Sequence, residues 1–107
     1  MLIQLKKEIL QKANPEKAKI LQRFFKTGQG EYGEKDLFLG LNVPEQRKIA
    51  KKYKELSIND LQELLNSKFH EHRLIALLIL IEKYNKLKED NEKNIEKKQI
   101  IDFYLKN

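Results

Sequence analysis

Four basic side chains stand close together in the middle of the sequence: Arg47, Lys48, Lys51 and Lys52. Residues four apart are neighbours on a helix, so Arg47 would lie beside Lys51 and Lys48 beside Lys52, on one broad face. Such a face could contact the phosphates of a nucleic-acid backbone. A helix face that is merely solvated is the alternative interpretation, and the spacing alone favours neither.

The segment Gly28-Gln-Gly30-Glu-Tyr-Gly33 has the letters of the dinucleotide-binding motif G-x-G-x-x-G. That motif holds a pyrophosphate only where a strand leads into it and a helix begins directly after it. Here a helix is expected before it, and the acidic Glu34-Lys-Asp36 follows. We therefore predict no nucleotide cofactor and interpret the glycines as part of a tight surface loop.

The segment His70-Glu71-His72 suggests a metal site at first sight. Its two histidines would lie on different faces of a helix, however, and no third ligand pattern is nearby. Helix capping and surface packing are the expected roles, and no metal site is predicted. The acidic residues are scattered among lysines on faces that we expect to be solvated, so no pair of catalytic carboxylates stands out.

The composition indicates one small, basic domain. The chain has 107 residues, of which 40% are hydrophobic and 36% charged, and it lacks cysteine, so it could work in a reducing compartment. Its net charge of +6 is uneven, because residues 1–26 hold seven Lys/Arg against two Glu, whereas residues 70–107 hold eight against seven acids. A segregated positive surface is typical of proteins that bind polyanions, although many basic proteins bind none.

No segment of the sequence has the pattern of a signal peptide or a membrane span. The charged Lys6-Lys7-Glu8 stands where a signal peptide would need apolar residues. The longest apolar run, Leu74 to Ile81, is far shorter than the ~20 residues that cross a bilayer. We expect a soluble, cytoplasmic protein without a membrane partner.

Apolar residues recur at helical spacing along most of the chain. A first helix is predicted from Leu2 to Ala13, and Asn14-Pro15 then caps and begins a second helix that runs to about Lys26. Residues 27–42 contain all four glycines and form a long connection, which we interpret as a functional loop.

The second half of the chain continues the helical pattern. Pro44 begins a third helix with a basic outer side, and Ser57 caps a short fourth one. A fifth helix at about 70–84 is apolar all round between 74 and 81, which indicates a central position, and a sixth spans about 91–105. We predict an all-α protein of about six helices in antiparallel pairs, either a closed bundle or a stack of repeats.

Two segments, 23–47 and 70–84, carry a specific combination of residues, and Asn14-Pro-Glu-Lys-Ala18 supports them. The most specific part is Phe38-Leu-Gly-Leu-Asn-Val-Pro-Glu-Gln-Arg47. Together they resemble the AlkD-like DNA alkylation repair family. The resemblance implies an α-α superhelix of HEAT-like repeats whose concave basic surface holds duplex DNA. It also implies hydrolysis of the N-glycosidic bond of alkylated purines, in which a carboxylate stabilises the positive charge that develops on the sugar.

The residues that the family uses for this hydrolysis are not matched here. The carboxylate belongs to a Trp-x-x-x-Asp motif on a later helix, and this sequence has no tryptophan. Asp102 follows Lys98 by four residues, as a helix-surface acid would, so no catalytic residue is carried over. Because family members are longer, the resemblance predicts that residues 1–107 are one HEAT-like helical domain, the N-terminal part of a longer repair protein.

The resemblance places further residues of this chain near DNA. It matches Phe24 to an aromatic residue and Asn42 to an amide that approach DNA in relatives, and Lys26 is added from the same segment. Core packing and loop capping are the alternative roles of Phe24 and Asn42. These three residues and the four basic residues of 47–52 form the predicted DNA-binding set.

Two functions are compatible with these observations. The first is the DNA-binding part of an alkylpurine DNA glycosylase-like repair enzyme, with duplex DNA as partner; whether this chain is itself an enzyme stays open. The alternative is a helical-repeat scaffold that binds protein or nucleic acid and catalyses nothing. In the first case, the apolar Ile100, Ile101 and Tyr104 are expected to face solvent near the C-terminus and to favour self-association.

Overall fold

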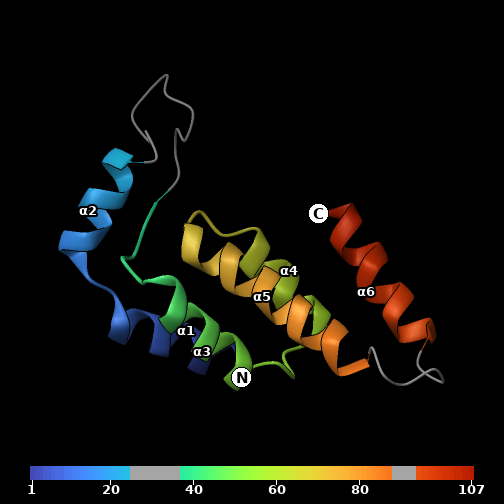
Figure 1. Ribbon diagram of the computed structural model, residues 1–107. Helices are drawn as coiled ribbons and strands as arrows, with labels where there is room; N and C mark the ends of the chain where they lie inside the picture. The colour runs from blue at the N-terminus through green and yellow to red at the C-terminus, as the bar shows by residue number, and fades with distance from the viewer. Residues whose placement is uncertain (25–36, 88–93) are drawn as a thin grey trace.

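The computed structural model describes residues 1–24, 37–87 and 94–107, and these residues fold into α-helices without a β-strand. The helices are α1 (Leu2–Lys12), α2 (Pro15–Phe24), α3 (Val43–Lys52), α4 (Ile58–Leu65), α5 (His70–Leu87) and α6 (Asn94–Lys106). Helix α5 packs against α3, α4 and α6, and α3 also contacts α1 (Figure 1). The prediction of an all-α fold is confirmed, and the packing of helix pairs is consistent with a helical-repeat fold.

Three helices begin at a side chain that accepts hydrogen bonds from backbone N–H groups two or three residues later. Asn14 caps α2 at 3.1 and 3.2 Å, Asn42 caps α3 at 2.9 Å, and Ser57 caps α4 at 3.2 Å. Pro15 and Pro44 lie in the first turns of α2 and α3, where their missing N–H has no helical partner to lose. The predicted helix starts at residues 15, 44 and 58 are therefore confirmed to within a residue.

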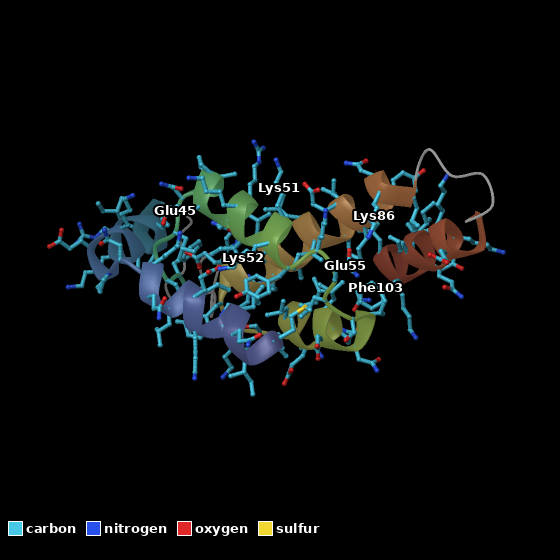
Figure 2. All side chains as sticks on the ribbon, turned by 90° about the horizontal axis from the view of Figure 1, so that it is seen from below. Glu45, Lys51, Lys52, Glu55, Lys86 and Phe103 are labelled. Carbon is cyan, nitrogen blue, oxygen red and sulfur yellow. The ribbon has the colours of Figure 1, made fainter. Side chains whose placement is uncertain are left out.

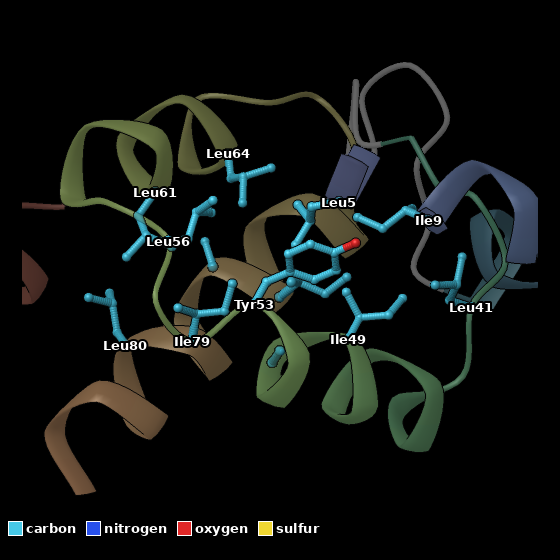
Figure 3. Close-up of a cluster of buried hydrophobic side chains, with 13 residues drawn as sticks. Leu5, Ile9, Leu41, Ile49, Tyr53, Leu56, Leu61, Leu64, Ile79 and Leu80 are labelled. Carbon is cyan, nitrogen blue, oxygen red and sulfur yellow. The ribbon is translucent and has the colours of Figure 1, made fainter. Parts of the chain in front are cut away.

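The core lies where α1, α3, α4 and α5 meet (Figure 3). Leu5 and Ile9 of α1 reach it from one side, Ile49 of α3 and Leu61 of α4 from others, and all four side chains are at most 1% exposed. Helix α5 runs through the middle and contributes Ile75, Ala76, Ile79 and Leu80. This arrangement confirms the predicted central position of α5 and leaves the outer side of α3 facing solvent.

Two details of the predicted helices were wrong. Helix α5 continues to Leu87, beyond the predicted end at 84. The expected burial all round this helix also fails at Ile81, which is 54% exposed. In α6, Ile101 and Tyr104 are 43% and 57% exposed, whereas Ile100 is partly buried against the core. No helix within the described ranges is long and apolar enough to cross a membrane.

Candidate nucleic-acid interface

Helix α3 separates a buried side from a basic side. Gln46, Ile49 and Ala50 are at most 3% exposed and face the core, because they recur at helical spacing against α5. Arg47, Lys48 and Lys51 lie on the opposite side and are exposed. Within the described part of the chain, none of these three cations is held in an ion pair. We call Arg47, Lys48 and Lys51 the α3 basic face.

The fourth predicted cation of this helix, Lys52, is already engaged. Its ammonium group donates a hydrogen bond to a carboxylate oxygen of Glu8 on α1 at 2.5 Å, and Figure 2 shows Lys52 on the side of α3 that faces α1. The hydrogen bond to Glu8 and its negative charge raise the pKa of Lys52. Lys52 is still 62% exposed, so a phosphate could reach it, but only in competition with Glu8.

Of the other predicted DNA-binding residues, the structure describes Asn42 fully, Phe24 without its side chain, and Lys26 not at all. Asn42 is exposed, and its side chain caps α3, so the capping role considered from the sequence is the one observed. Phe24 is the last residue of α2, but its side chain and the whole of Lys26 lie outside the described residues. Most of the predicted functional loop, residues 27–36, lies outside them as well.

A buried carboxylate fixes the turn that leads into α3. Both oxygens of Glu71 accept backbone N–H groups: Leu39 donates at 2.9 Å, Gly40 at 2.8 Å and Leu41 at 3.4 Å. Glu71 is 1% exposed, and burying a polar side chain at such a depth is costly unless it is hydrogen-bonded. The carboxylate thus ties residues 39–41 to the start of α5 and sets where α3 begins.

Gly40 suits this turn because of its backbone angle and of a close contact with α2. Its φ of +88° belongs to the left-handed region, which residues with a side chain rarely adopt. A Cβ added here would stand 2.1 Å from the carbonyl oxygen of Asn14. The turn and the start of α2 therefore lie in direct backbone contact, which the hydrogen bond from Asn14 N–H to the Leu39 carbonyl at 2.8 Å reinforces.

Two neighbouring side chains complete the support. The Gln46 side-chain amide donates to the Leu41 carbonyl at 3.0 Å, and the Phe38 ring lies 4.9 Å from the His70 ring, centre to centre. The Phe38 to Arg47 segment is thus one local unit, in which buried residues hold the turn and exposed ones form the α3 basic face.

The expected surface packing of His70-Glu71-His72 was wrong for Glu71 and His72, since both are buried. The Ser67 hydroxyl accepts the Phe69 N–H at 3.1 Å and lies 2.9 Å from His72 Nδ1. A hydroxyl can donate one hydrogen bond and accept two, so the direction of the Ser67–His72 hydrogen bond depends on the tautomer of the imidazole. Burial is the main reason why the pKa of His72 is lowered, and the positive charge of Lys6 adds to it.

The lowered pKa of His72 predicts that the protein becomes less stable in mild acid. In the unfolded chain, His72 takes up a proton near its ordinary pKa of about 6.5, whereas the folded protein resists it, so the free energy of unfolding falls as the pH drops below that value. Urea unfolding at pH 7.5 and 5.5 should show this fall in the wild type and a smaller one in His72→Gln. His70→Gln is the matched control and should keep the wild-type fall; parallel changes in all three proteins would contradict the assignment.

The described residues offer binding chemistry more readily than catalysis. They contain no group of three or more His, Cys, Asp or Glu side chains that could hold a metal ion. Among the described residues, the deeply buried carboxylate of Glu71 already accepts three hydrogen bonds from the 39–41 turn. The α3 basic face, in contrast, presents positive groups to solvent, and the other side of α3 is packed into the core.

Comparison with known proteins assigns the chain to a family. The family model described as DNA alkylation repair enzyme matches residues 5–107. Searches of curated proteins and of solved structures gave no significant match. The matched range includes the 39–41 turn, Glu71 and the α3 basic face, and it confirms the resemblance seen in the sequence. Because the match covers nearly the whole chain, this protein belongs to the DNA alkylation repair enzyme family.

Proposed function

We propose that this domain is the DNA-binding part of a DNA alkylation repair enzyme and that it holds duplex DNA through the α3 basic face. The observation that carries the proposal is that Arg47, Lys48 and Lys51 are exposed and unpaired within the described residues, on a helix whose other side is locked into the core. Family membership supports DNA as the partner. Cations that contact phosphates give affinity without reading the base sequence.

The proposal assigns binding, and not bond cleavage, to these residues. The implied family reaction is hydrolysis of the N-glycosidic bond of an alkylated purine, and the tryptophan-containing motif for it is not in this chain. HEAT-like repeats, a cytoplasmic location and self-association stay predictions. The exposed Ile101, Tyr104 and Leu105 of α6 give self-association an apolar surface to use.

The salt dependence of duplex binding tests the proposal. Each neutralised phosphate contributes about −0.9 to the slope of the logarithm of the binding constant against that of the salt concentration. We expect a slope of about −3 if the α3 basic face makes three contacts, and about −4 if Lys52 leaves Glu8 to make a fourth. Fluorescence anisotropy with a labelled duplex at several salt concentrations measures it. A flat response, or no binding at low salt, would refute the proposal and favour a protein-binding scaffold.

A further inference from the structure

A second group of lysines gathers around one carboxylate beyond the end of α3. Glu55 lies in the turn after α3, and its carboxylate accepts a hydrogen bond from the Lys86 ammonium group of α5 at 2.7 Å. Figure 2 shows the two side chains next to each other. The hydrogen bond and charge of Lys86 lower the pKa of Glu55, and the nearby Lys83 and Lys54 lower it further. Three lysines therefore converge on a single acid.

This group begins close to the C-terminal end of α3, the helix that carries the α3 basic face. Lys48 and Lys51 are spaced three residues apart on α3, and Glu55 lies three residues beyond the end of this helix, in the turn that follows it. Glu55 is thus the first acidic residue after the lysines of α3, in the turn at the end of that helix. Lys86 and Lys83 border the same place from α5, around a cavity of about 530 Å³.

The ion pair between Glu55 and Lys86 is open to exchange. Its two side chains are 60% and 56% exposed, and surface ion pairs of this kind are weak because water screens them. A phosphate carries the same charge as the carboxylate and accepts the same hydrogen bond from an ammonium group. A phosphate at this place could therefore replace Glu55 as the partner of Lys86.

We propose that Lys83 and Lys86 extend the duplex-binding surface from α3 onto α5. Glu55 is the hydrogen-bond partner of Lys86 until a backbone phosphate replaces it. The inference rests on the proposed function, because it needs duplex DNA on the α3 basic face. Glu82 and Glu96 also line the cavity and make its interior neutral overall. The phosphate is therefore expected at the rim of the cavity beside Lys86, and not inside it.

Two substitutions of opposite effect test this extension. Lys86→Gln should weaken duplex binding on the order of fivefold and make the salt slope shallower by about 1, because one phosphate contact is lost. Glu55→Gln should strengthen binding on the order of fivefold, because the competing carboxylate is gone. Lys106→Gln on α6 and Glu63→Gln on α4 make the same charge changes at other exposed positions and should leave the affinity nearly unchanged.

The outcomes separate this inference from the proposed function. If the wild type binds duplex DNA but each substitution behaves like its charge-matched control, the extension onto α5 is wrong and the α3 basic face still stands. If the wild type does not bind, both fail. Weaker binding in Lys86→Gln together with stronger binding in Glu55→Gln, measured by anisotropy on folded protein, would establish the extension.

Discussion

Gly40→Ala is expected to lower the free energy of unfolding by about 3 kcal/mol or more. The new Cβ would stand 2.1 Å from the Asn14 carbonyl oxygen and 3.0 Å from the Ala18 nitrogen. These two atoms form the first hydrogen bond of α2, at 2.9 Å, so the clash cannot be relieved by a side-chain rotation. Thermal unfolding followed by circular dichroism should show a midpoint lower by roughly 12 to 24 °C.

Gly40→Asn separates the two causes of this loss. Asparagine tolerates a positive φ better than alanine does, but it brings a Cβ to the same place. If the close approach to α2 dominates, both variants should be destabilised to a similar extent. If the left-handed backbone dominates, Gly40→Asn should recover much of the stability. An unfolding free energy of Gly40→Ala within about 0.5 kcal/mol of the wild type would contradict the described contact, because that is the range of neutral surface substitutions.

Local signals in the sequence were enough to predict most helix starts. Asn14, Asn42 and Ser57 each cap a helix through atoms two or three residues away, so the whole interaction is contained in a short segment. The central position of α5 was also predictable, since a run of apolar residues without a polar side needs neighbours on several sides. The extent of burial around α5 was not predictable, because the exposure of Ile81 depends on which helices pack beside it.

The role of Glu71 could not be read from its surroundings in the sequence. The three N–H groups that it accepts belong to residues 30 to 32 positions earlier, and no local spacing encodes such a contact. An acid between two histidines at the start of a helix has the pattern of a surface position. The only signal was indirect: a glycine at position 40, in a segment otherwise rich in large apolar residues, indicates a constrained backbone.

In the candidate site too, local features were predictable from the sequence and long-range contacts were not. The spacing predicted correctly that Arg47, Lys48 and Lys51 share the exposed side of a helix, whereas Lys52 lies on the side that faces α1. It could not show that Lys52 is paired with Glu8, because that partner comes from α1, 44 residues away. The pairing of Lys86 with Glu55 across 31 residues was hidden for the same reason. Charge spacing thus predicts which side chains are presented together, and only the fold shows which of them remain available.

The double charge reversal Lys48→Glu/Lys51→Glu should weaken duplex binding by about 100-fold at low salt and make the salt slope shallower by about 2. Two phosphate contacts are lost, and two negative charges now face the DNA. Because both side chains are exposed and make no ion pair within the described residues, the free energy of unfolding should change by no more than about 0.5 kcal/mol. Anisotropy measures the binding, and urea unfolding checks the fold.

Lys98→Glu/Lys106→Glu on α6 is the control for this reversal. Both residues are exposed, and the variant lowers the net charge by four, as the α3 variant does. If the DNA lies on α3, the control should keep most of the wild-type affinity, because only charges near the phosphates release counterions on binding. Equal losses in the two variants would mean that the duplex responds to total charge and has no fixed place on the protein. The α3 basic face would then be a solvated helix side, the alternative that the spacing of its lysines left open.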